Sequence, residues 1–224
     1  MTSDAPAARK QVIAELRGTG RLADDLYLMA HNDRTGKPRL QPRAAGLGLA
    51  SALLAELVVA GRLTIGEDRV SAAVGHEPAD ALGRRVMQLV SEETETHGAA
   101  DWLGFLAVTA AGDVAGRLGE AGYLAWRPAP WRRDGRWVPT DSSCAFTPVI
   151  RAAGALNPAR PLTVPGATLT ALAGACGLGP LVTRHAVDGA RSPEEAAAFL
   201  PPALQYLIAQ TRATVDGALL THRI

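Results

Sequence analysis

Side chains suited to binding a charged ligand are concentrated between Tyr123 and Val138. This segment contains three of the four tryptophans of the chain and a dense set of arginines. The residues that we assign to a lipid or membrane site are Trp126, Arg127, Trp131, Arg132, Arg133, Arg136 and Trp137. Tryptophan is favoured at the headgroup layer of a membrane because its ring is apolar and its N–H is polar. Arginine pairs with phosphate through parallel hydrogen bonds, so the pattern predicts docking on an anionic phospholipid surface.

The centre of this segment, Asp134-Gly135, is a strong signal for a hairpin turn. Each basic residue near an anionic surface contributes about 1 kcal/mol, so four would contribute about 4 kcal/mol before ordering costs. That magnitude suits weak, reversible docking. Two other interpretations remain open. The tryptophans could pack on the body of the protein while the arginines are solvated or paired with Asp134 and Asp141; or the hairpin could bind a protein partner or a second copy, as in a soluble interaction scaffold or homo-oligomer.

A second basic cluster lies beside an expected turn at residues 32–38. Its members are Arg34, Lys37, Arg39 and Arg43. Arg43 stands at an expected helix start, and helix starts together with arginine favour anions. We therefore interpret Arg39, Gln41 and Arg43 as a candidate anion site. The alternative is a solvated loop whose charges serve solubility.

Motifs for nucleotide binding are weak. Gly46-Leu47-Gly48 lacks a third glycine and a preceding strand, so small residues for close helix packing explain it better. The glycine-rich run at residues 174–179 has no following Lys-Ser or Lys-Thr, and a helix end is the better interpretation.

Signals for a metal site or a nucleophile are also weak. Glu93, His97 and Asp101 are spaced by one helical turn, but Gly98 interrupts the helix that would align them. Cys176 and His185 lack an evident third, orienting group. We therefore predict no catalytic residues, no metal and no cofactor.

Net charge, cysteine content and the longest apolar stretch further restrict the possible classes of function. The chain has 224 residues and a net charge of +1, which argues against a general nucleic-acid binder. Cys144 and Cys176 are the only cysteines and lack metal-site spacing, which suits a reduced, cytoplasmic setting. The longest apolar stretch, Ala44 to Ala60, contains Glu56 and is short for a membrane span, so we expect a buried core helix. Contact with a membrane would then be peripheral, on its cytoplasmic face.

The hydrophobic periodicity and the turn residues predict a mainly α fold. Residues 1–20 form an extension with a short helix at 6–17, and residues 21–224 form a single helical domain. Further helices are expected at 22–31, 44–60, 78–91, 101–110, 113–120 and 166–176, and at 194–211, where Pro201-Pro202 splits the segment into two. One short hairpin is expected near 63–74, and a projecting Trp/Arg β-hairpin near 123–139.

Two stretches carry a family resemblance. The first is LADDLYLMAHNDRTG at residues 22–36, and the second is PRAAGLGLASALLAELVVAGRL at residues 42–63. An acidic-apolar helix, a turn ending in glycine and a helix closing on Glu-Leu-x-x-x-Gly-Arg-Leu resemble the Golgi phosphoprotein 3 family. The Glu-Ala-Gly-Tyr-Leu run at 120–124 is similar to the segment that leads into that family's surface hairpin.

The resemblance implies a helical fold with a projecting hairpin, peripheral binding to an inositol phospholipid headgroup, and adaptor work without catalysis. In the eukaryotic members a Trp and three Arg residues form the headgroup pocket. The corresponding positions here are Gln41, Ala50, Val108 and Ala111. Because all four residues differ, the sequence does not assign a headgroup, and the protein clients are also left open.

Overall fold

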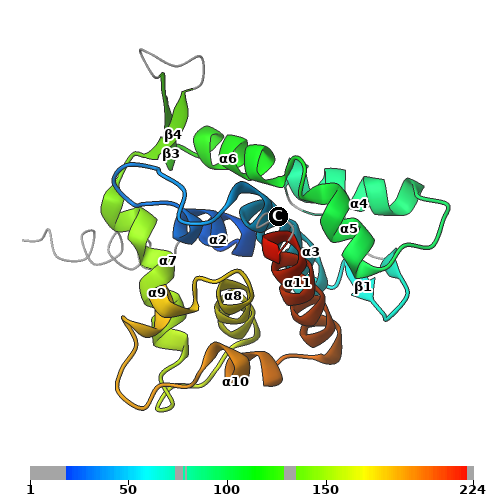
Figure 1. Cartoon of the computed structure of the whole chain (residues 1–224). Coiled ribbons are helices and arrows are strands. Elements are labelled where there is room, and N and C mark those ends of the chain that lie inside the picture. The colour runs from blue at the N-terminus through cyan, green and yellow to red at the C-terminus, as the bar shows by residue number, and fades with distance from the viewer. Residues whose placement is uncertain (1–18, 74–77, 79, 129–134, 221–224) are drawn as a thin grey trace, which may run out of the picture.

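The computed structural model describes residues 19–73, 78, 80–128 and 135–220 (Figure 1). The helix expected at residues 6–17 lies outside these ranges. The described helices are α2 (Leu22–Ala30), α3 (Pro42–Val59), α4 (Ala81–Glu92), α5 (Ala99–Leu106), α6 (Ala110–Glu120), α7 (Ser142–Ala155), α8 (Val164–Ala175), α9 (Gly179–Thr183), α10 (Pro193–Ala198) and α11 (Pro202–Leu220). Two antiparallel hairpins complete the described fold: β1 (Leu63–Ile65) with β2 (Val70–Ala72), and β3 (Leu124–Arg127) with β4 (Arg136–Pro139). The mainly α prediction is confirmed.

Helix α3 is the centre of the core. It packs against α2, α5, α6, α8 and α11, which surround it in Figure 1. Small residues allow this close packing: a Cβ at Gly46 would lie 2.5 Å from the Ala107 carbonyl oxygen, and one at Gly48 would overlap the Cys176 sulfur. By length and hydropathy α3 could cross a membrane, but most of its residues are buried inside the protein. It is the buried core helix that the sequence predicts.

The end of α3 is set by Gly61, which has a φ of +67°. The Gly61 N–H donates to the Val58 carbonyl at 2.9 Å, and the Arg62 N–H donates to the Leu57 carbonyl at 2.7 Å. This is the Schellman arrangement that glycine permits after a helix. It turns the chain directly into β1.

Helix α2 differs from its prediction. The sequence pattern indicates one buried face, yet all nine residues of α2 are buried. Asp24 is 3% exposed and Asp25 is 1% exposed, so two adjacent carboxylates lie inside the protein. Buried carboxylates require partners, and these partners define a charged site described below.

Other boundaries shift for local reasons. Helix α4 begins at Ala81 and not at Pro78, because the Asp80 side chain caps it by accepting from the Gly83 N–H at 3.1 Å. Helix α5 spans Ala99–Leu106, earlier than the predicted 101–110. The predicted break at Pro201-Pro202 is confirmed, since α10 ends at Ala198 and α11 begins at Pro202. Helix α7 is not among the helices predicted from the sequence, and it contains Pro148.

Candidate functional site

The hairpin of β3 and β4 projects from the end of α6, away from the helical body (Figure 1). Its register pairs Trp126 with Trp137 and Arg127 with Arg136. Residues directly opposite each other share one face of the ribbon, and the faces alternate along each strand. The tryptophan pair and the arginine pair therefore lie on opposite faces of the hairpin. Trp131, Arg132 and Arg133 lie outside the described residues.

The tryptophan face rests on the protein body. The Trp126 and Trp137 rings meet edge to face, with centroids 5.3 Å apart. The Trp137 ring lies against α6, where a Cβ at Gly119 would come within 2.7 Å of it. Trp137 is half-buried, whereas Trp126 remains 52% exposed. Trp137 therefore anchors the hairpin, and Trp126 presents an indole ring to solvent.

The arginine face points away from α6. Arg127 and Arg136 are both exposed and have no carboxylate partner among the described residues. Asp141, one of the two aspartates that the alternative interpretation pairs with the arginines, caps α7 by accepting from the Ser143 and Cys144 N–H groups at 2.7 and 3.1 Å. The other, Asp134, lies outside the described residues. Like charges directly opposite in a hairpin destabilise it unless an anion lies between them. This face is suited to a phosphate or a carboxylate.

The turn at 32–38 lies beside the hairpin, so the structure brings the two basic clusters together. A Cβ at Gly36 would overlap the Trp137 carbonyl oxygen, so the turn backbone lies directly on β4. The Asn32 side chain accepts from the Arg34 and Thr35 N–H groups at 3.1 and 2.9 Å and shapes the turn. Arg34 and Lys37 are exposed. Together with Arg127 and Arg136 they form what we call the basic end, defined by these four residues.

The candidate anion site at 39–43 is less complete. Arg39 pairs with Asp33 at 3.2 Å and donates to the His31 carbonyl at 3.0 Å, so its charge is engaged. Gln41 and Arg43 are exposed at the start of α3. The remaining positions of the family headgroup pocket offer no cation: Ala50 is fully buried, Val108 is 84% exposed and Ala111 is half-buried.

A charged network that the sequence did not predict lies inside the body. Arg117 of α6 pairs with Asp24 at 2.7 Å, with Asp80 at 3.1 Å and with Glu56 at 3.3 Å. Glu56 also accepts from the Ala23 N–H at 2.7 Å, which satisfies one of the free donors at the start of α2. One guanidinium thus ties together α2, α3, α6 and the cap of α4.

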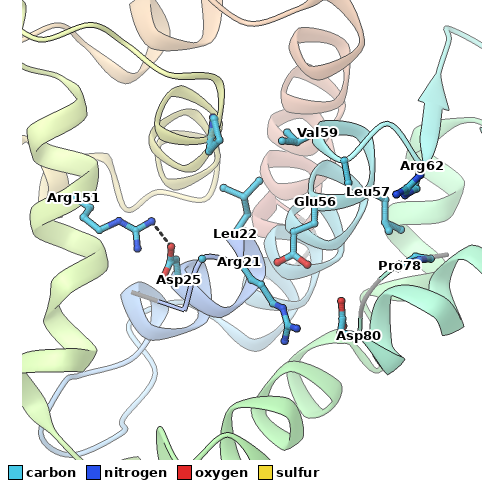
Figure 2. A pocket seen from close by; sticks show the side chains of 13 residues that line it. Arg21, Leu22, Asp25, Glu56, Leu57, Val59, Arg62, Pro78, Asp80 and Arg151 are labelled. Atoms are coloured by element: carbon cyan, nitrogen blue, oxygen red, sulfur yellow. Dashed lines mark hydrogen bonds and ion pairs between the residues drawn. The ribbon is translucent and has the colours of Figure 1, made fainter. Parts of the chain in front are cut away.

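A pocket of about 420 Å³ opens next to this network (Figure 2). Asp25, Glu56 and Asp80 enter it from different segments, and Arg151 of α7 donates to Asp25 at 2.6 Å across one side. Arg21 and Arg62 also line it, beside apolar residues such as Leu57 and Val59. Among the described residues that line the pocket there is no Ser, Cys, His, Lys or Tyr side chain. This described lining therefore offers paired charges.

Burial dominates the acid–base properties of the network. It raises the pKa of Asp25 to about 6, although Arg151 acts in the opposite direction. Burial likewise raises the pKa of Asp24 and of Glu56 against the pull of Arg117. For Asp80 burial is outweighed by the Gly83 N–H and Arg117 hydrogen bonds, and its pKa is lowered. These shifts follow from the balance between desolvation, which raises the pKa of a carboxyl group, and hydrogen bonds and nearby cations, which lower it.

The remaining sequence motifs do not form catalytic sites within the described part of the chain. Cys176 is buried at the end of α8, and burial raises the pKa of its thiol to about 12. His185 stacks edge to face on Phe146 with centroids 5.1 Å apart. Glu93, His97 and Asp101 do not share a helix, since α4 ends at Glu92 and α5 begins at Ala99. No group of His, Cys, Asp and Glu among the described residues could hold a metal ion.

Two features of the sequence could have revealed the network. Asp24-Asp25 stands within an apolar helical pattern, and Glu56 stands within the longest apolar stretch. A carboxylate at such positions indicates a buried partner. Nothing in the spacing identifies Arg117 as that partner, because it lies 61 residues from Glu56 in the chain.

The fold and the surface features define a class: helical proteins built around one buried helix, with an aromatic-cationic hairpin standing on the surface. The family model of Golgi phosphoprotein 3 (GPP34) matches residues 22–211, and the chain belongs to this family. The match begins at the first residue of α2 and ends inside α11, so it includes both hairpins and the Arg117 network. A search of curated proteins gives no match to the chain.

Proposed function

We propose that this protein is a non-catalytic adaptor that docks peripherally on an anionic phospholipid surface through its hairpin end. The observation that carries the proposal is the hairpin itself, with Trp126 half-exposed beside Arg127 and Arg136, two exposed cations that have no carboxylate partner among the described residues. Membership of the Golgi phosphoprotein 3 family supports an adaptor role at a membrane. Arg34 and Lys37 of the adjacent turn extend the same positive surface.

The docking is mainly electrostatic, and the Trp126 ring adds an aromatic contact with the headgroup layer. Exposed Arg and Lys near an anionic bilayer contribute about 1 kcal/mol each, so the four cations of the basic end contribute about 4 kcal/mol before ordering costs. Trp126 adds an amphipathic ring suited to the headgroup layer. Headgroup selectivity is not part of the proposal, because the family pocket positions carry Gln41, Ala50, Val108 and Ala111.

Vesicle sedimentation tests this proposal. The wild-type protein should bind vesicles that contain phosphatidylglycerol, should bind phosphatidylcholine vesicles less, and should be released by salt because exposed charges are screened. The double variant Arg127→Glu with Arg136→Glu should lose binding. Arg160→Glu with Arg184→Glu, the same double charge change at exposed arginines after α7 and after α9, is the matched control and should bind nearly as wild type.

The competing interpretation is a soluble scaffold that uses the hairpin to bind itself or a partner. Light scattering of the same variants separates the two. If Arg127→Glu with Arg136→Glu dissociates an oligomer but leaves vesicle binding intact, the hairpin serves as a scaffold for self-association and not as a membrane-docking site.

A further inference from the structure

A small hollow between α4 and α5 has aromatic and acidic walls. It measures about 180 Å³ and is lined by Leu89, Glu93, His97, Asp101, Trp102 and Phe105. In Figure 1 the α4–α5 end of the molecule lies far from the β3–β4 hairpin. The hollow is therefore separate from the surface proposed to dock on a membrane.

The rings of this hollow meet at right angles. Trp102 and Phe105 have an interplanar angle of 90° and centroids 5.9 Å apart. The His97 ring crosses the Trp102 ring at 88°, with centroids 6.4 Å apart. In an edge-to-face contact the edge of one ring covers a face of the other, so the free aromatic surface at the hollow comes mainly from the exposed ring of Phe105. A cation over a free aromatic face is attracted by the ring quadrupole.

Phe105 is not held there by the core. It is 60% exposed, whereas Trp102, less than one turn earlier, is 6% exposed. The two rings thus have different roles: Trp102 is anchored in the body, and Phe105 stands as an open wall. The exposed Phe105 ring is therefore accessible to a ligand in the hollow.

The charge at the hollow is negative. Carboxylate oxygens of Glu93, Glu95 and Asp101 each lie 4.0 Å from a His97 ring nitrogen. The sequence has no Lys or Arg between residues 86 and 116. Arg69 lies in the turn between β1 and β2. Its guanidinium donates to the Thr96 hydroxyl at 3.0 Å. The hollow therefore combines aromatic rings with the carboxylates of Glu93 and Asp101, which lie near the His97 ring.

We propose that this hollow binds the quaternary ammonium group of a small soluble molecule such as choline. A quaternary ammonium has no N–H to donate, so it needs no hydrogen-bond acceptors in fixed positions. Its charge is spread over methyl groups, which pack against rings while nearby carboxylates supply the counter-charge. The volume of about 180 Å³ suits a group of that size and is below the range usual for drug-sized ligands.

Titration calorimetry on the full chain tests this site with choline chloride and tetramethylammonium chloride, each against potassium chloride at equal ionic strength. We expect saturable binding of both organic cations and none of potassium. Phe105→Ala should weaken binding about tenfold, and Phe105→Trp should retain it. Asp101→Asn should also weaken binding, while its remaining carbonyl oxygen still accepts from the Gly98 N–H that caps α5.

The matched control is Val108→Ala, which changes an 84% exposed side chain outside the hollow and should bind as wild type. Absence of saturable binding, or equal affinity in the wild type and in Phe105→Ala, would overturn the proposal. Phosphatidylcholine vesicles form a separate arm. Vesicle binding that depends on Phe105 would show that the ammonium group belongs to a lipid headgroup. It would overturn the proposal that the ligand is a small soluble molecule.

Discussion

Trp137 packs its ring directly on Gly119, one helical residue before Glu120 closes α6. A Cβ at Gly119 would lie 2.7 Å from two atoms of the indole ring. The hairpin therefore owes its orientation to the absence of a side chain on the helix beneath it. Gly36 makes a second close approach, where its backbone meets the Trp137 carbonyl.

Gly119→Val should displace the Trp137 ring and destabilise the protein by about 1–3 kcal/mol, since added methyl groups in a packed contact force neighbours to move. Denaturant unfolding measures this loss. Gly116→Val is the control, because a Cβ at Gly116 meets nothing within 4 Å. Equal losses in the two variants would show that the ring does not depend on Gly119.

The sequence predicts most of the elements because their signals are local. Gly61 and Gly122 end helices through positive φ angles, and Pro201-Pro202 divides the last helical segment. The hairpin follows from residue types alone. Its orientation does not, because the contact of Trp137 with Gly119 and Gly36 depends on tertiary packing.

The charged network around Arg117 could not be predicted from local signals. Its members are distant in sequence, and the partner of each carboxylate is fixed only by folding. Helix α7 is not among the predicted helices either. Proline inside a helix removes a backbone hydrogen bond, and Pro148 of α7 is buried in the core.

Arg117 holds three carboxylates, so Arg117→Met should be strongly destabilising. The variant leaves Asp24, Glu56 and Asp80 close together without their shared cation, and such uncompensated charge costs about 3–5 kcal/mol. Chemical denaturation gives the free energy of unfolding. Arg184→Met, at an exposed arginine, should change it by less than about 0.5 kcal/mol. A loss below about 1 kcal/mol in Arg117→Met would contradict the network.

The two cysteines should differ in reactivity. Cys176 is 3% exposed and its pKa is raised to about 12 by burial, so little thiolate forms at neutral pH. Cys144 is half-buried. We expect a thiol reagent to modify Cys144 in the native protein and to reach Cys176 only on unfolding. Mass spectrometry of the native Cys144→Ser variant checks this: rapid labelling of Cys176 would be inconsistent with the structure.

Asp25 should make stability depend on pH in an unusual direction. Its folded pKa is raised from 3.8 to about 6, so the folded state binds the proton more tightly than the unfolded chain does. Its contribution is therefore fully present below pH 4 and is lost as the pH rises through about 6, a change of about 3 kcal/mol. Asp25→Asn removes this dependence. The unfolding free energy of the wild type, relative to that of the variant, should therefore fall as the pH rises over that range.

Asp80 provides the comparison with the opposite sign. Its pKa is lowered, so its contribution is present above its unfolded pKa and is lost as the pH falls. Asp80→Asn should therefore remove a dependence that weakens the protein in acid. Unfolding curves measured from pH 2 to pH 7 for both variants distinguish the two carboxylates, because the Asp80 contribution changes below about pH 4 and the Asp25 contribution changes between about pH 4 and pH 6. If Asp25→Asn and Asp80→Asn changed the pH dependence in the same direction, the assignment of burial to Asp25 and of hydrogen bonding to Asp80 would fail.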